Sequence, residues 1–261
     1  MSNSSLVSYT KLSPNHSGKR THSIDRITPH CVVGQLSCES IAGCFPAGRE
    51  ASCNYGIGTD GRISLIVEEK NRSWCSSSNA NDQRAVTIEC ASDKSEPYAM
   101  NSKVYASLVK LCVDICKRNG KKKLLWFADK NKSLNYNPKA DEMVLTVHRW
   151  FANKSCPGNW LYARLGDLAS EVTKQLTGGT SSGGGTTTPS TGKTLYRVQT
   201  GAFSKKANAD ALVAKLKSKG FDTYMVVAGG LYKVQVGAYS VKANAEAQMK
   251  KLKNAGFDAF I

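Results

Sequence analysis

The sequence predicts an α/β protein in which a mixed central sheet is flanked by helices, followed by a small α+β domain. Short apolar runs with strand character alternate with longer segments that repeat apolar residues at helical spacing. A stretch composed almost entirely of Gly, Ser and Thr then interrupts the chain. Beyond it lies an internal repeat that combines strand and helix signals. These three observations indicate two folded units.

The first 176 residues alternate between strand-like and helix-like segments. Strands are expected at residues 24–31, 53–58, 62–67, 85–91, 123–127 and 144–150. Helices are expected at residues 37–45, 104–120 and 159–176. In the second helix, an apolar stripe comprises Val104, Leu108, Leu111, Cys112 and Ile115, and Cys116 belongs to the same helix. We therefore expect these two thiols in the core rather than in a metal site.

Residues 177–193 read TGGTSSGGGTTTPSTGK and cannot bury an apolar face. This composition predicts a flexible tether between a domain at residues 1–176 and a domain at residues 194–261. In the second domain, YRVQTGAFS at Tyr196 is repeated as YKVQVGAYS at Tyr232. Each copy continues into a helical segment and a short strand, which predicts a βαββαβ layout with a tight hairpin between the copies. The second copy ends early, so its last strand is expected to be short.

The chain carries 36 basic and 20 acidic residues, a net charge of +16. Such a field favours a polyanionic partner, for example nucleic acid, an anionic membrane surface or a teichoic acid-bearing wall. The first residues lack the apolar segment of a secretory signal, and no run has the length of a membrane span. We therefore expect synthesis in a reducing cytoplasm, with the nine cysteines mostly free and without membrane insertion.

The sequence contains only four histidines, and two of them end apolar, strand-like runs. His30 follows ITP and His148 follows VLTV, whereas the others lie in a polar N-terminal stretch. Cys156 follows His148 within HRWFANKSCPG. Two imidazoles and a thiolate form a suitable catalytic zinc set with a fourth position open for water. From spacing alone, a buried pair of histidines with a buried thiol is an equally good interpretation.

The segments ITPHC, SCNYGIGTDGRISLIVEE, NDQRAVTIEC and TVHRWFANKSCPG resemble, in this order, the type 2 N-acetylmuramoyl-L-alanine amidases. That family includes phage amidases and peptidoglycan recognition proteins, and the similarity covers roughly residues 24–168. It implies a zinc-dependent hydrolase that cleaves the amide between N-acetylmuramic acid and L-alanine in peptidoglycan. By motif, the zinc ligands are His30, His148 and Cys156.

The same resemblance implies the other site residues. Tyr55 and Lys154 match groups that donate hydrogen bonds to the developing oxyanion, and Glu89 is the candidate general base or a structural residue of the sheet. Many relatives have an aromatic residue followed by histidine where this chain has Trp74 and Cys75. The candidate substrate-binding residues are Trp74, Asn81 and Arg84, and packing is an equally good role for Trp74.

The C-terminal repeat resembles a SPOR domain, which implies binding to glycan strands stripped of their stem peptides. The candidate glycan-binding residues are Gln199, Phe203, Gln235 and Tyr239. Gln199 and Gln235 suit hydrogen bonds to sugar hydroxyls, whereas Phe203 and Tyr239 suit either stacking on sugars or the core. The βαββαβ layout also matches an RNA-binding fold, but the aromatic sequence pattern of that fold is absent.

Four functions are thus compared: a zinc amidase, a non-catalytic wall sensor, a cysteine peptidase of the wall and a nucleic-acid binder. Retention of both histidines and the cysteine favours the amidase, and we expect peptidoglycan rather than nucleic acid as the partner. A wall amidase without a leader suits a phage or prophage endolysin released by a holin, or an autolysin of mother-cell lysis. The Cys-rich, Lys-rich sequence resembles clostridial examples. The sequence does not define an oligomeric state.

Overall fold

The computed structural model describes residues 2–178, 196–221, 223–239 and 242–261. Backbone contacts divide the chain into two compact units, Met1–Gly183 and Gly184–Ile261. The predicted tether at residues 177–193 lies outside the described residues, apart from the two positions that follow the last helix of the first unit.

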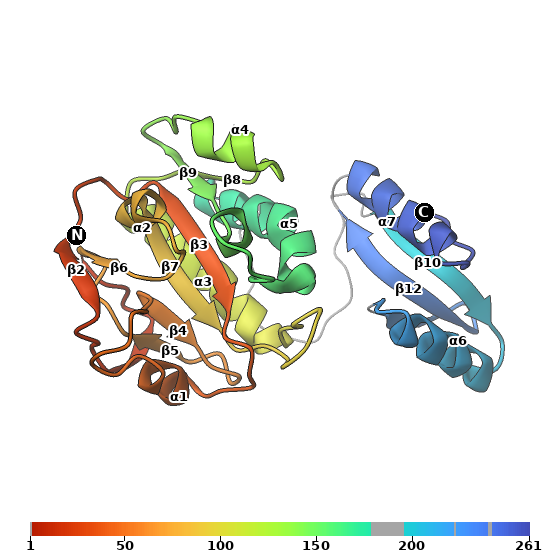
Figure 1. Cartoon of the computed structure of the whole chain (residues 1–261). Coiled ribbons are helices and arrows are strands. Elements are labelled where there is room, and N and C mark those ends of the chain that lie inside the picture. Colours follow the sequence, from red (N-terminus) through yellow and green to blue (C-terminus); the bar gives the residue numbers. More distant parts are fainter. Residues whose placement is uncertain (1, 179–195, 222, 240–241) are drawn as a thin grey trace. The chain divides into compact units, whose positions relative to one another are not determined.

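A seven-stranded mixed sheet forms the centre of the first unit, in the order β1-β5-β4-β7-β3-β9-β8 (Figure 1). Only β4 and β5 are antiparallel, and the other neighbouring strands are parallel. The predicted α/β class with a mixed central sheet is therefore confirmed. The strands are β1 (Val7–Thr10), β3 (Arg26–Cys31), β4 (Tyr55–Ile57), β5 (Ile63–Leu65), β7 (Ala85–Cys90), β8 (Lys123–Leu125) and β9 (Glu142–Leu145). Two further strands, β2 (His16–Lys19) and β6 (Asn71–Ser73), pair with each other.

The helices of this unit are α1 (Cys38–Gly43), α2 (Asn79–Arg84), α3 (Ser102–Arg118), α4 (Lys130–Asn135) and α5 (Gly158–Leu176). Helices α3 and α5 contact each other, and α3 also contacts β4 and β7. Asn101 begins α3 by accepting hydrogen bonds from the amides of Lys103 and Val104, as a good N-cap does. No helix among the described residues is long and apolar enough to cross a bilayer.

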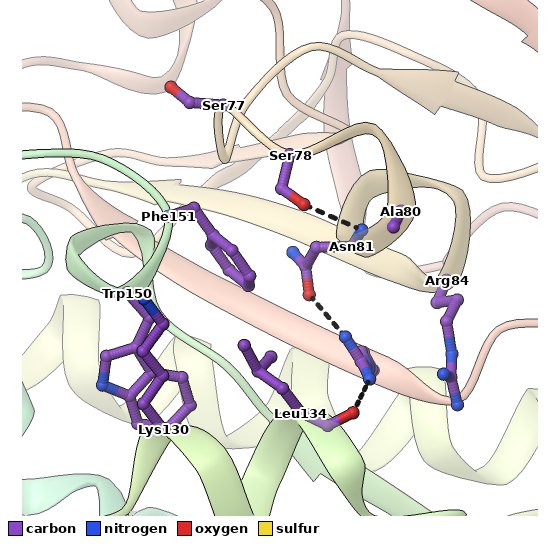
Figure 2. A pocket seen from close by; sticks show the side chains of 10 residues that line it. Ser77, Ser78, Ala80, Asn81, Arg84, Lys130, Leu134, Trp150 and Phe151 are labelled. Carbon is purple, nitrogen blue, oxygen red and sulfur yellow. Dashed lines mark hydrogen bonds between the residues drawn. The ribbon is translucent and has the colours of Figure 1, made fainter.

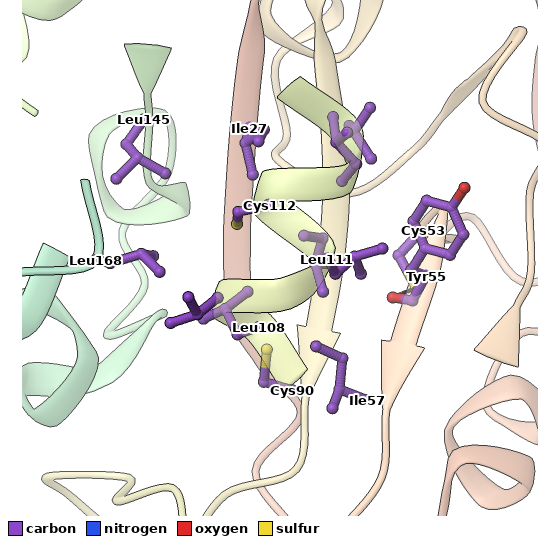
Figure 3. Close-up of a cluster of buried hydrophobic side chains, with 14 of the residues drawn as sticks. Ile27, Cys53, Tyr55, Ile57, Cys90, Leu108, Leu111, Cys112, Leu145 and Leu168 are labelled. Atoms are coloured by element: carbon purple, nitrogen blue, oxygen red, sulfur yellow. Dashed lines mark hydrogen bonds between the residues drawn. The ribbon is translucent and has the colours of Figure 1, made fainter. Parts of the chain in front are cut away.

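Side chains of β3 alternate between two faces of the sheet, and this alternation separates core from site. Ile27 packs in the buried cluster with Leu108 and Leu111 of α3 (Figure 3). Thr28 lies on the opposite face, where its hydroxyl contacts Asn81 of α2 at 3.0 Å. Because strand positions two apart share a face, His30 lies on the face of Thr28 and not on the face of α3.

The predicted strand at residues 144–150 ends earlier than expected. Strand β9 stops at Leu145, and His148–Trp150 form a 3₁₀ turn, η1. The amide of Arg149 donates to the carbonyl of Cys156 at 3.1 Å, so the backbone closes a loop instead of continuing the sheet. The short polar elements β1, β2, β6, α2 and α4 were not predicted.

The second unit has an antiparallel sheet in the order β10-β12-β11, with β10 (Tyr196–Phe203), β11 (Tyr224–Ala228) and β12 (Leu231–Tyr239). Helices α6 (Lys206–Ser218) and α7 (Lys242–Asn254) contact β10 and β12. The predicted hairpin is present: Gly229 and Gly230, with φ of 63° and 73°, turn β11 into β12. The expected last strand is reduced to one bridge between Phe260 and Gln199. The small α+β fold is confirmed, with a shortened final strand.

Candidate metal centre

Neighbouring strands bring two of the predicted zinc ligands together. His30 lies in β3 and is 1% exposed, and His148 follows β9, the neighbour of β3 in the sheet. The ring centroids of the two histidines are 5.1 Å apart. Cys156 completes the group, because its Sγ lies 3.3 Å from His30 Nδ1. One ligand atom from each of these three residues lies within 4.8 Å of the other two.

The loop from His148 to α5 positions the thiol. The Arg149 amide and side chain both donate to the carbonyl of Cys156, at 3.1 and 3.4 Å. The Arg149 guanidinium also donates to the carbonyl of Ser155 and, at 3.1 Å, to Asn159 Oδ1. One arginine thus fixes the turn that carries Cys156 beside the histidines.

The electrostatics of the group suit a divalent cation. Burial, together with the neighbouring His148, lowers the pKa of His30, and burial with the Lys154 charge lowers the pKa of His148. Both imidazoles are therefore neutral, as metal ligands must be. His30 Nε2 is buried and has no hydrogen-bond partner among the described residues. These donors fit zinc in type and number.

Glu89 lies beside this group as the cross-strand partner of His30. Its Oε2 is buried without a hydrogen-bond partner among the described residues, and its Oε1 lies 3.9 Å from Cys75 Sγ. Burial raises the pKa of Glu89 to about 7, against smaller opposing effects of Arg49 and Cys75. A carboxyl that changes charge near neutral pH suits general acid–base chemistry.

Tyr55 does not lie at this site, which corrects the expectation that it acts on the substrate. Strand pairing places Gly56 next to Glu89, so Tyr55 points to the opposite face. Its hydroxyl donates to Glu69 Oε1 at 2.6 Å and accepts from the Ser4 amide at 2.9 Å. The ring is fully buried in the core (Figure 3). Burial and Glu69 raise the pKa of Tyr55, so the phenol is a neutral structural group.

Lys154 is exposed in the loop before Cys156, close enough to His148 for its charge to lower the pKa of that histidine. Trp74 is half-buried, and its indole donates to Ser17 Oγ at 2.7 Å. The structure thus places Lys154 near His148, whereas Trp74 contacts the β2 strand.

A pocket of about 520 Å³, whose lining side chains are drawn in Figure 2, lies beside His148. The hydroxyl of Ser77, at the rim of the pocket, lies 3.0 Å from His148 Nε2. The pocket lining also includes Trp150 and Phe151, which lie two and three residues after His148 in sequence. The lining residues are Arg26, Ser77, Ser78, Ala80, Asn81, Arg84, Lys130, Leu134, Trp150 and Phe151.

Two lining residues were predicted to bind substrate, and both have partners within the fold. The Asn81 side chain is fully buried and bonded to Thr28, Ser76 and Thr146 at 3.0, 3.1 and 2.9 Å. Arg84 binds the Asp25 carboxylate, with a shortest contact of 2.5 Å. Asn81 therefore supports the pocket wall, and the hydroxyl of Ser77 is the pocket group that contacts His148.

In the second unit, the predicted glycan-binding residues separate onto two faces. Gln199 and Gln235 pair across β10 and β12, and Tyr224 of β11 is the next residue in the same row. The neighbours of Gln235 in β12, Val234 and Val236, are buried against the helices, so this row faces away from them. By contrast, Phe203 and Tyr239 pack against the buried cluster, as their alternative core interpretation expected.

Comparison with solved structures finds similar domains in proteins of known function. The peptidoglycan-binding domain of the Bacillus subtilis cell wall lytic enzyme CwlC is 49% identical, with 28% of this chain and 94% of that chain covered and a TM-score of 0.25. A mutant endolysin from Bacillus subtilis is 14% identical, with coverages of 63% and 97% and a TM-score of 0.41. Staphylococcus aureus hydrolase AmiA is 13% identical, with coverages of 66% and 85% and a TM-score of 0.44. No curated protein matches the chain.

Two family matches divide the chain as the two folded units do. The SPOR domain family matches residues 192–261, and the family described as N-acetylmuramoyl-L-alanine amidase matches residues 20–159. Because the second match extends over more than half of the 261 residues, the chain belongs to the N-acetylmuramoyl-L-alanine amidase family and carries a C-terminal SPOR domain.

Proposed function

We propose that the protein is a zinc-dependent amidase that hydrolyses the amide between N-acetylmuramic acid and L-alanine in peptidoglycan. Membership of the amidase family supports the activity. The observation that carries the proposal is the convergence of His30, His148 and Cys156, whose ligand atoms all lie within 4.8 Å of one another. Such a set leaves one coordination position open for water or substrate.

His30, His148 and Cys156 would hold zinc, which would supply Lewis-acid polarisation of the amide carbonyl and a water with a pKa of about 7. The protein supplies the remaining groups. Glu89 accepts the proton of the attacking water, since its carboxyl lies beside His30 and its pKa is about 7. The Lys154 ammonium, near His148, donates to the oxyanion that develops on the former carbonyl oxygen.

The contact of 3.3 Å between Cys156 Sγ and His30 Nδ1 also suits a cysteine peptidase, the second candidate function. Nucleophilic attack there needs a thiolate next to a protonated imidazole. The protonation equilibria oppose that pair. A hydrogen bond with Cys31 and burial raise the pKa of Cys156, while burial lowers the pKa of His30. A bound cation reverses the preference of the thiol, which favours the metal-dependent reaction.

We further propose that the SPOR domain holds the enzyme on glycan strands from which stem peptides have been removed. These strands are the product of the amidase reaction, so binding retains the enzyme where cleavage has begun. A net charge of +16 also suits attraction to an anionic Gram-positive wall. The proposed biological role is lysis, as an endolysin or as an autolysin of the mother cell.

Digestion of purified peptidoglycan tests the proposal by the chemical ends that it creates. We expect new L-alanine amino groups without new reducing sugars, loss of the reaction with a chelator, and recovery with zinc. New reducing sugars would show a glycosidase instead. Activity that resists complete metal removal and is abolished by thiol alkylation would establish the cysteine peptidase.

A further inference from the structure

A second set of metal-type donors meets next to the proposed zinc ligands. It consists of His30, Cys75 and Glu89, whose ligand atoms all lie within 4.8 Å of one another. This set shares only His30 with the first one. The proposed reaction gives Cys75 no role, although its thiol is 3.9 Å from the Glu89 carboxylate.

Two atoms of this second set are buried without hydrogen-bond partners among the described residues. They are Glu89 Oε2 and His30 Nε2, while the other nitrogen of His30 lies 3.3 Å from Cys156 Sγ. Buried polar atoms without partners are rare in folded proteins and call for a specific explanation. A cation between Glu89 and the imidazole would satisfy both atoms.

Secondary structure and a hydrogen-bonded turn hold the three donors in place. His30 and Glu89 are cross-strand partners in the interior of the sheet. The Cys75 amide donates to Asp82 Oδ2 at 3.1 Å, and the following amide, of Ser76, donates to the same carboxylate. Asp82 is 1% exposed, so the turn that presents the thiol is anchored inside the protein.

The chemistry of the donors selects a thiophilic divalent cation. Thiolate and imidazole prefer zinc and its heavier analogue cadmium, whereas magnesium and calcium prefer sets composed only of oxygen donors. The Cys75 thiolate and the Glu89 carboxylate together cancel the charge of the second cation, and His30, whose other nitrogen belongs to the first set, joins the second set as an imidazolate. The first set, with a single thiolate, leaves a net charge of +1 and a more electrophilic ion. The second position is therefore suited to binding rather than to catalysis.

We propose that His30, Cys75 and Glu89 form a second, inhibitory metal position that is occupied at zinc concentrations above those that fill the first. On binding, the Cys75 thiol and the protonated ring nitrogen of His30 each release a proton to solvent, so that His30 bridges the two ions as an imidazolate and Glu89 becomes a ligand as its carboxylate. Glu89 is then no longer available as a base. The inhibitory effect rests on the proposed amidase function, whereas the binding itself does not.

Cadmium titration of the full-length, metal-free protein tests the binding directly. Equilibrium dialysis gives the number of ions bound, and the ultraviolet charge-transfer absorbance of cadmium thiolates shows whether sulfur coordinates each ion. We expect two strong equivalents for the wild type. In Cys75→Ser and in Glu89→Gln, the affinity for the second equivalent should fall by about 100-fold or more. Cys44→Ser is the matched control, since Cys44 is also a half-buried free thiol but belongs to neither donor set.

Binding of only one cadmium ion with high affinity by the wild type would overturn the proposal. So would unchanged binding of two cadmium ions by both Cys75→Ser and Glu89→Gln, provided that each variant retains the wild-type circular dichroism. A parallel measurement compares hydrolysis at excess zinc with hydrolysis at one equivalent, within each protein. We expect this ratio to be well below one for the wild type and near one for Cys75→Ser. Two bound ions without peptidoglycan hydrolysis would refute the amidase function and leave the second position standing.

Discussion

His30 and Glu89 lie side by side on the neighbouring parallel strands β3 and β7, and both lie on the opposite face of the sheet from Ile27, which packs with α3. This pairing puts the buried imidazole of His30 beside a half-buried carboxyl whose pKa is about 7. Strand register, rather than sequence proximity, thus brings the proposed ligand His30 beside the proposed base Glu89. The consequences of this arrangement can be measured by substitution.

Replacing Cys156 by Ala is expected to abolish zinc binding and peptidoglycan hydrolysis together. The thiolate supplies the only negative charge of the first donor set, and His30 and His148 alone hold zinc weakly. Metal content per chain and release of L-alanine amino groups are the two measurements. Cys44→Ala is the control and should retain both. Hydrolysis at the wild-type rate by Cys156→Ala would remove Cys156 from the ligand set.

Lys154→Ala should lower kcat by about 100- to 1000-fold, the usual effect of losing one donor to an oxyanion. Because the Lys154 charge contributes to lowering the pKa of His148, that pKa should rise in the metal-free variant. The kinetic effect is measured on soluble wall fragments, and the pKa by NMR of the imidazole. Lys154→Arg retains the charge and should restore the low pKa. An unchanged kcat in Lys154→Ala would show a purely electrostatic surface role.

Tyr55→Phe is expected to affect stability and not catalysis. It removes the hydroxyl between the Ser4 amide and Glu69, although Glu69 keeps its ion pair with Arg118 at 2.6 Å. Loss of one buried partner should lower the free energy of unfolding by about 1–3 kcal/mol. Urea denaturation measures this change, and kcat should remain within about twofold of wild type because the ring is on the opposite face from Glu89. A large loss of kcat at unchanged stability would return Tyr55 to the reaction.

The sequence predicted that His30, His148 and Cys156 converge, which the structure shows, but it misplaced Tyr55, and the difference has a physical cause. His30 and His148 end apolar strand-like runs, and such runs are visible without a structure. Which face a strand residue occupies depends on register, and a shift of one residue exchanges the faces. Glu89 pairs with Gly56, so its neighbour Tyr55 points into the core.

Other features of the site depend on contacts between distant or irregular segments. Cys75 reaches Glu89 through a turn anchored by Asp82, and Ser77 reaches His148 across 71 residues. Neither contact has a periodic signal in the sequence. The two folded units were predictable because the apolar residues of α3 and the SPOR repeat recur with strong periodicity. The strands β1, β2 and β6 were not predicted because they are short and polar.

In the metal-free protein, the Glu89→Gln substitution should raise the free energy of unfolding by an amount that depends on pH. The pKa of Glu89 is about 7 in the fold and has an ordinary value of 4.5, because burial disfavours the charged form. As the pH rises, Glu89 therefore ionises in the unfolded chain before it ionises in the folded protein. This difference destabilises the fold increasingly from pH 4.5 and reaches its full size above about pH 7. Between pH 4 and pH 8, the free energy of unfolding of Glu89→Gln should therefore increase by up to about 3 kcal/mol relative to that of the wild type. Denaturation in chelator at both pH values measures it, and a pH-independent difference would contradict the raised pKa.

Gln235→Ala and Phe203→Ala should separate glycan binding from folding in the SPOR domain. Gln235 lies in the row with Gln199 and Tyr224, away from the helices, and Tyr224 is 67% exposed, which suits stacking on a sugar. Loss of the Gln235 amide should weaken binding to denuded glycan by about tenfold, the equivalent of one hydrogen bond, with little change in stability.

Phe203 packs against the buried cluster, so Phe203→Ala should instead lower the unfolding free energy of this domain by about 2 kcal/mol. Co-sedimentation of the full chain with denuded glycan, and thermal unfolding, measure the two effects. If Phe203→Ala weakened binding without loss of stability, the sugar would contact the aromatic pair rather than the glutamine row.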